Sequence, residues 1–82
     1  MDIQELRKQA HDLDVTVRVG KGGVEAVVDE LDGQLRDRTL VKVKFLNAAR
    51  GGTDVDELAT DLADRVNATL VETRGHTAVV YR

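Results

Sequence analysis

The chain lacks cysteine, proline, tryptophan and serine, and Phe45 and Tyr81 are its only large aromatic residues. The absence of cysteine excludes disulfides and thiolate chemistry and makes a cytoplasmic location the default expectation. The absence of serine excludes a serine nucleophile. With so few aromatic rings, the core must be built from Val, Leu, Ile and Ala.

Long apolar runs are also missing. No stretch is long enough to cross a bilayer, and the N-terminal segment is charged throughout, so neither a membrane span nor a signal peptide is expected. The 82 residues allow one modest core. We therefore expect residues 1–82 to form a single, monomeric globular domain.

Positive charge is in the minority, since the formal net charge is −3. Taken alone, this balance argues against a polyanionic partner. Asp outnumbers Glu two to one, and Arg outnumbers Lys two to one. Such a surface suggests adaptation to concentrated salt, with an ordinary acidic surface as the alternative.

The apolar periodicity predicts seven elements in the order α-β-α-β-α-β-β. We expect helices over residues 3–13, 24–38 and 54–66, and strands over 15–19, 39–46, 68–73 and 77–82. Asp2 and either Thr53 or Asp54 are candidate helix N-caps, and Gly75 suits a hairpin turn. Strand–helix–strand steps favour parallel pairs, and the last two strands an antiparallel hairpin. The predicted fold is α+β, a two-layer arrangement with a mixed four-stranded sheet and helices packed largely on one face.

The strands also predict a basic stripe. Lys42 and Lys44 alternate with apolar residues, and Arg18 has the same outward parity on its own strand. These three side chains should therefore project from the face of the sheet that the helices leave free. Lysines on a solvated strand face are also common for solubility alone.

The run Gly20-Lys21-Gly22-Gly23 joins a predicted strand to a predicted helix. Such a loop can aim backbone N–H groups at a phosphate, with help from the helix dipole and from the charge of Lys21. The alternative is a tight turn that needs left-handed backbone angles. Arg50 follows the strand that carries the lysines, so its loop could share one surface with residues 20–23.

Catalytic patterns are not evident. His11 and His76 are far apart in the sequence and form no metal-ligand spacing, and the carboxylates are spread over helix faces. No Walker or dinucleotide-binding pattern occurs. We expect no catalytic residue, metal, cofactor or small-molecule substrate, and a protein that is not an enzyme.

Several motifs together resemble the CRM domain (chloroplast RNA splicing and ribosome maturation), in particular its stand-alone, YhbY-like prokaryotic members. The similarity covers essentially the whole chain. It consists of the loop at residues 20–23, the strand "LVKVK" at residues 40–44, Gly75, and the final "VVYR" at residues 79–82. The acidic balance departs from the basic surface usual in that family.

The resemblance implies a fold like the C-terminal domain of translation initiation factor three. It also implies an RNA-binding module that contacts ribosomal RNA during large-subunit ribosome assembly, with the GxxG loop as part of the contact. The candidate RNA-binding residues are Gly20, Lys21, Gly22, Gly23, Arg18, Lys42, Lys44 and Arg50. The alternatives are a protein–protein adaptor without RNA binding, a splicing-type RNA chaperone, and a small enzyme that binds phosphate esters.

Overall fold

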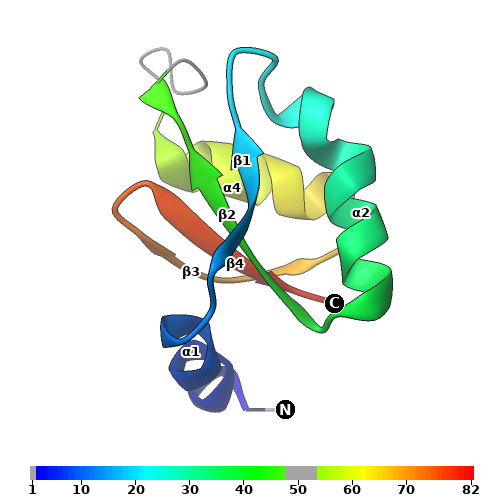
Figure 1. The fold of residues 1–82 in the computed structure, drawn as a ribbon. Coiled ribbons are helices and arrows are strands. Elements are labelled where there is room, and N and C mark those ends of the chain that lie inside the picture. The colour runs from blue at the N-terminus through cyan, green and yellow to red at the C-terminus, as the bar shows by residue number, and fades with distance from the viewer. Residues whose placement is uncertain (1, 48–53) are drawn as a thin grey trace.

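The computed structural model describes residues 2–47 and 54–82, and Figure 1 shows the arrangement of their helices and strands. All seven predicted elements are present in the predicted order. The helices and strands are α1 (Ile3–His11), β1 (Val15–Val19), the 3₁₀ turn η1 (Val24–Val27), α2 (Val28–Asp37), β2 (Leu40–Phe45), α4 (Val55–Arg65), β3 (Thr69–Arg74) and β4 (Thr77–Tyr81).

Local signals explain the ends of the helices. Asp2 and Asp54 are N-caps whose carboxylates accept the backbone N–H groups of Gln4 and Asp56. The second predicted helix differs from expectation, because it opens with four residues of 3₁₀ turn and becomes α-helical only at Val28.

The four strands within the described residues form one sheet in the order β1-β2-β4-β3. β1 and β2 are parallel, as predicted, and β3 and β4 form the predicted antiparallel hairpin. The prediction that β2 and β3 pair directly is wrong, because β4 lies between them and pairs antiparallel with β2. The sequence of β4 explains this: Ala78, Val79 and Val80 are consecutive and all buried, as in a central strand packed on both faces.

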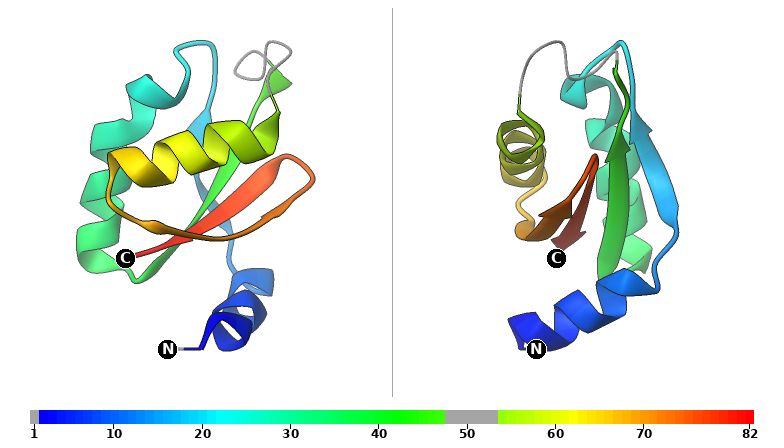
Figure 2. Two further views of the ribbon diagram at one scale, coloured as in Figure 1. Left: turned by 180° about the vertical axis from the view of Figure 1, so that it is seen from behind. Right: turned by 90° about the vertical axis from the view of Figure 1, so that its left-hand side faces the viewer.

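The main core lies between the sheet and two helices. α2 and α4 cover one face, as Figure 2 shows from behind and from the side. Their side chains pack on the inward residues of the strands, with Leu31 of α2, Leu62 of α4 and Phe45 of β2 almost completely buried. Gln34 of α2 also holds β1 through a paired contact: Thr16 Oγ1 donates to its Oε1 at 2.6 Å, and its Nε2 donates to the Thr16 carbonyl at 3.1 Å.

α1 lies on the opposite face, at the end of the sheet where β2 begins and β4 ends (Figure 1). It is held by a second, smaller cluster, in which Leu6 and Ala10 pack against Leu40, Val71 and Val79. The expected free face is therefore only partly free. We call it the open face: the side of the sheet opposite α2 and α4, which α1 covers at one end.

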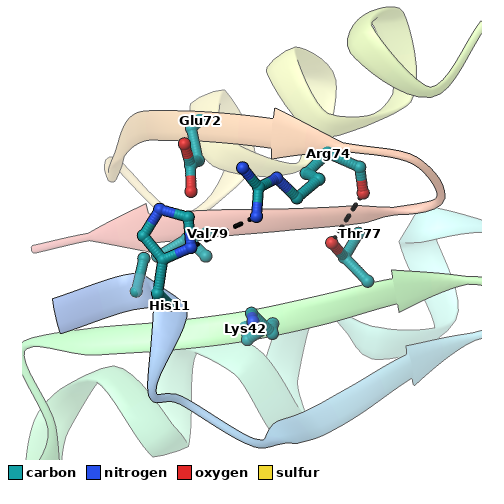
Figure 3. A pocket seen from close by; sticks show the side chains of 7 residues that line it. His11, Lys42, Glu72, Arg74, Thr77 and Val79 are labelled. Carbon is teal, nitrogen blue, oxygen red and sulfur yellow. Dashed lines mark hydrogen bonds between the residues drawn. The ribbon is translucent and has the colours of Figure 1, made fainter. Parts of the chain in front are cut away.

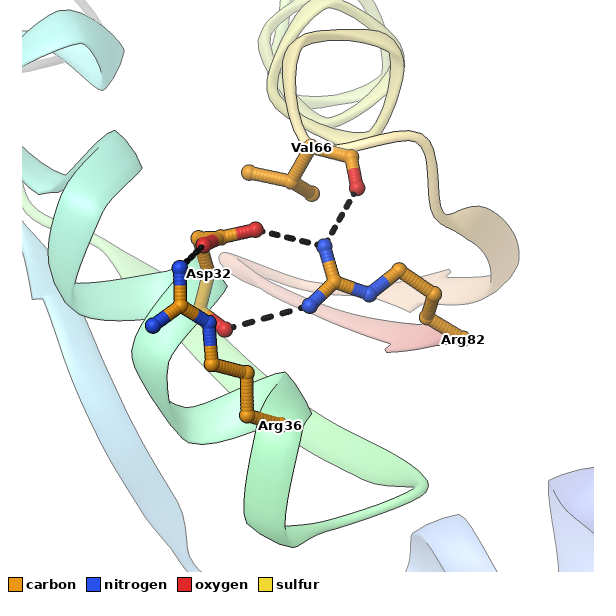
Figure 4. A network of polar contacts seen from close by, with 4 residues as sticks. All are labelled: Asp32, Arg36, Val66 and Arg82. Carbon is orange, nitrogen blue, oxygen red and sulfur yellow. Dashed lines mark hydrogen bonds and ion pairs between the residues drawn. The ribbon is translucent and has the colours of Figure 1, made fainter.

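Arg82 fastens the end of the sheet to the helical layer (Figure 4). Its guanidinium donates to the Asp32 carboxylate at 2.6 Å, to the Asp32 carbonyl at 3.2 Å and to the Val66 carbonyl at 2.8 Å. Asp32 also forms an i,i+4 ion pair with Arg36. The hydrogen bond from Arg82 is the main reason that the pKa of Asp32 is lowered, with partial burial opposing the shift.

In the described part of the chain, no helix is both long enough and apolar enough to cross a membrane.

Candidate nucleic-acid interface

The glycine loop, residues 20–23, is a closed turn at the end of β1. The Gly23 N–H donates to the Gly20 carbonyl at 3.0 Å, which leaves Lys21 and Gly22 at the tip. Gly23 has φ +74° and ψ −173°, a conformation almost restricted to glycine. A Cβ on Gly22 would lie 2.8 Å from the Cβ of Ala26, which is too close. The turn itself therefore requires two of the three glycines.

The turn does not require a glycine at position 20. A Cβ there would make ordinary contact with Leu46 Cδ1 at 3.8 Å. The loop also differs from the predicted phosphate seat in two ways. The Gly23 N–H is used within the turn, and the loop leads into the short η1 rather than directly into α2. Because a helix dipole acts mainly within the first turn, α2 contributes less positive potential than expected.

The ends of β1 and β2 bring the loop and a basic pair together. The Leu46 N–H donates to the Val19 carbonyl at 2.9 Å, so the two parallel strands stay paired up to the loop. Arg18 and Lys44 are direct neighbours in the register, and both are exposed. Their outward parity is confirmed, because the alternate residues Val19 and Phe45 point into the main core. The tip of the loop and this pair thus occupy one end of the molecule.

A shallow hollow of about 250 Å³ adjoins the same strand end. It is lined by Lys44, Phe45, Leu46, Asn47 and His76, and the Phe45 N–H donates to the His76 carbonyl at 2.7 Å. The turn between β3 and β4 therefore reaches this end of the sheet as well. Arg50, the remaining predicted site residue, lies outside the described residues.

Lys42 lies in a different environment from Arg18 and Lys44, the other two residues of the predicted basic stripe. It is half-buried and lines a cavity of about 70 Å³ between the end of α1 and the open face (Figure 3). His11, Glu72, Arg74 and Thr77 line the same cavity, over a floor that includes Ala10 and Val79. Arg74 Nη1 lies 3.2 Å from His11 Nδ1. Because a guanidinium can only donate, Nδ1 is the acceptor of this contact.

Sequence reasoning missed His11, Glu72, Arg74 and Thr77. His11 comes from the end of α1, and its place against β3 depends on tertiary packing. A bulge in β3 between Leu70 and Glu72 shifts the register, so that Glu72 and Val79 face each other. The bulge turns Glu72 and Arg74 onto the open face, which simple alternation through the strand would not show.

Acidic side chains gather on the other layer. The exposed carboxylates of α2 and α4 are Asp29, Glu30, Asp37, Asp56, Glu57, Asp61 and Asp64. The negative net charge therefore coexists with a basic open face. Within residues 2–47 and 54–82, no group of three or more His, Cys, Asp or Glu side chains could hold a metal ion.

Comparison with known proteins identifies the family. The sequence profile described as "CRS1 / YhbY (CRM) domain" matches residues 1–82. The chain belongs to the CRM domain family. The resemblance inferred from the glycine loop and the strands is thereby confirmed.

Two curated relatives carry RNA-binding names. One, from Methanocaldococcus jannaschii, is called "Probable RNA-binding protein" and is 43% identical over 77 residues. The match covers 94% of this chain but only 58% of that protein, so the chain spans little more than half of this relative. The other, "Probable RNA-binding protein YqeI" of Bacillus subtilis, is 35% identical over 78 residues, with coverage of 94% and 79%.

A solved structure confirms the fold of this CRM domain. The solution structure of a hypothetical protein from Staphylococcus aureus, described as "a putative RNA binding protein", superposes with a TM-score of 0.80 at 33% identity. The match covers 98% of this chain and 82% of that one.

Proposed function

We propose that this CRM domain is a non-catalytic RNA-binding module that acts in the cytoplasm on ribosomal RNA during assembly of the large ribosomal subunit. Its contact surface consists of the glycine loop, with Lys21 at the tip, and the neighbouring Arg18 and Lys44. The names of the relatives support RNA as the partner. The ribosomal target rests on the family resemblance.

The observation that carries the proposal is the common position of the loop and the basic pair. Lys21 projects from a turn that directly continues β1, and Arg18 and Lys44 lie side by side on the last residues of β1 and β2. Three exposed cations thus follow one end of the sheet. Cations spaced along the end of a sheet can contact successive phosphates of an RNA backbone. An exposed side chain at the tip of a glycine turn can also approach that backbone closely.

The test is a charge reversal at the loop tip with a matched control. Lys21→Asp should weaken binding to a structured ribosomal RNA fragment about tenfold, which corresponds to the loss of one charge-assisted hydrogen bond. Arg38→Asp is the control, because Arg38 is exposed at the opposite end of α2 from the loop. Gly22 stays unchanged, since a Cβ there would disturb the turn itself.

Fluorescence anisotropy with labelled RNA measures the affinities, and circular dichroism checks that both variants are folded. Equal affinities of the two variants would contradict the role of the loop. If the wild-type protein bound no RNA at all, and a pull-down at the same salt concentration recovered a protein partner instead, the adaptor alternative would replace the proposal. Sedimentation of tagged protein with large-subunit precursors tests the ribosomal target separately.

A further inference from the structure

We propose that the cavity between α1 and the open face is a second RNA contact, which holds one backbone phosphate between Lys42 and Arg74. The inference rests on the proposed RNA-binding function and adds a site at a distance from the glycine loop. We call this site the α1 cavity, and its lining residues are Ala10, His11, Lys42, Glu72, Arg74, Thr77 and Val79.

The lining has the chemistry that a phosphate requires. Lys42 comes from β2 and Arg74 from β3, so the two cations approach the same space across β4 (Figure 3). The Thr77 hydroxyl donates to the Arg74 carbonyl at 2.8 Å, so it would have to turn its proton away from that carbonyl to donate to a phosphate oxygen. An arginine can also bind two phosphate oxygens at once.

The cavity is small but large enough. Its volume of about 70 Å³ exceeds several-fold the roughly 10–15 Å³ that one water molecule needs. A compact phosphate group therefore suits it better than a stacked base. The half-buried position of Lys42 also matters, because a cation with reduced access to water interacts more strongly with an anion than a fully solvated one.

Glu72 sets the strength of the site. Its carboxylate lines the same cavity as Arg74 and His11, where it repels an incoming phosphate (Figure 3). The described residues of the cavity thus carry two permanent cations against one carboxylate. This composition predicts a weak contact that helps to orient an RNA already bound at the loop.

His11 is a positioning residue in this arrangement. Its Nδ1 accepts from Arg74 Nη1 at 3.2 Å and so holds the guanidinium over the cavity. Because His11 is the last residue of α1, a phosphate in the cavity would also fix α1 against the sheet through Arg74.

The experiment compares three variants, each of which removes one side-chain charge from the cavity, with one control variant. Lys42→Gln and Arg74→Gln should each weaken binding of the ribosomal RNA fragment, whereas Glu72→Gln should tighten it. Arg65→Gln is the control, because it removes one exposed positive charge from α4 on the other face of the sheet. An effect of Arg65→Gln equal to that of the cavity variants would overturn the proposal, as would weakened binding by Glu72→Gln.

Salt dependence tests whether one phosphate is shared. The logarithm of the binding constant decreases linearly with the logarithm of the salt concentration, and this negative slope becomes shallower by about 0.7–0.9 for each phosphate that the protein no longer neutralises. The Lys42→Gln/Arg74→Gln double variant should show about that change in slope once, whereas two separate phosphates would give about twice the change and would overturn the shared site. His11→Ala should weaken binding in the wild type but leave the Arg74→Gln variant unchanged, because His11 acts only through Arg74.

The two proposals fail in distinguishable ways. Suppose that the wild type binds RNA, that Lys21→Asp weakens this binding, and that the cavity variants have the same RNA affinity as Arg65→Gln. The α1 cavity is then not a contact, while the proposed function stands. If the wild type binds no RNA, the proposed function itself is wrong.

Discussion

Gly20 and Gly23 have different reasons to be glycine, although both belong to the same four-residue loop. Gly23 adopts a backbone conformation that side chains rarely allow, whereas Gly20 has an ordinary φ and room for a Cβ. The conformation of the turn therefore accounts for Gly23 but not for Gly20. Close approach of a ligand to the main chain would account for Gly20.

Replacement of each glycine by alanine separates these reasons. Gly23→Ala should lower the free energy of unfolding by about 1–3 kcal/mol, because the new Cβ is forced into a glycine-only region. Gly20→Ala should be neutral or stabilise by up to about 1 kcal/mol, since it restricts the unfolded chain at a compatible position. Urea titrations of both variants measure the difference. Equal destabilisation by the two substitutions would contradict this account of the loop.

Asp32 makes the contribution of the Arg82 contact dependent on pH. The hydrogen bond from Arg82 lowers the pKa of this carboxyl group below its unfolded value. A group with a lowered folded pKa stabilises the protein fully above its unfolded pKa and loses that contribution as the pH falls through the folded value.

The stability advantage of the wild type over Asp32→Asn should therefore be largest near pH 6 and should shrink below about pH 4, close to the ordinary pKa of aspartate. Urea unfolding of the two proteins at pH 6 and pH 3 measures it. Arg82→Gln should show the same narrowing relative to the wild type, because it removes the main cause of the shift. A difference that stays constant between the two pH values would contradict the assignment.

At the scale of elements, periodicity predicted almost the whole fold. Alternation identified β1 and β2 because both bury every second residue on one face. The order of the strands in the sheet was harder to predict from the sequence, since β4 pairs with β2 through long-range packing. The unbroken apolar run of β4 was nevertheless a signal for a central strand. The 3₁₀ start of the second helix depends on the geometry of the glycine turn, for which periodicity gives no indication.

The candidate site shows the same limit. Arg18 and Lys44 followed from parity alone, because their strands are parallel and regular where they pair. His11 and Arg74 could not be predicted to meet, since their contact depends on the docking of α1 and on the bulge in β3. Residues within one strand are thus predictable from spacing, whereas a cavity between elements requires the tertiary structure.

Among the α-helices of the described residues, α1 should be the least stable, because a small cluster holds it while α2 and α4 share the main core. Leu6→Ala removes a buried side chain from that cluster and should raise amide exchange in α1, with exchange in α2 and β2 little changed. Leu31→Ala, the matched change in the main core, should destabilise the whole protein by about 2–5 kcal/mol. Hydrogen exchange read by mass spectrometry compares them, and equal exchange across all elements in Leu6→Ala would show that α1 unfolds only with the rest.

At the scale of the whole molecule, the charges are segregated between the two faces. The exposed carboxylates of α2 and α4 outnumber the exposed Arg36 and Arg65 of the same helices, whereas the strands of the open face carry one carboxylate, Glu72, against the cations Arg18, Lys42, Lys44 and Arg74. An acidic protein can therefore present a basic surface to a polyanion, with the acidic layer turned away. Net charge alone, which argues against a polyanionic partner, does not reveal this arrangement.

The acidic layer should make folding depend on salt. Neighbouring carboxylates on α2 and α4 repel one another, and added ions screen that repulsion, so the melting temperature should rise as potassium chloride goes from millimolar to molar concentration. The melting temperature of the Glu57→Gln/Asp64→Asn variant should rise less with salt, because the substitutions remove two of the exposed carboxylates of α4 that repel their neighbours.

RNA affinity should fall over the same range, since phosphate contacts weaken with salt. Opposite trends of stability and affinity would mean that concentrated salt favours the fold while it leaves RNA binding dependent on shape and hydrogen bonding. A melting temperature that does not change with salt, in the wild type as in the variant, would identify the aspartates as an ordinary acidic surface.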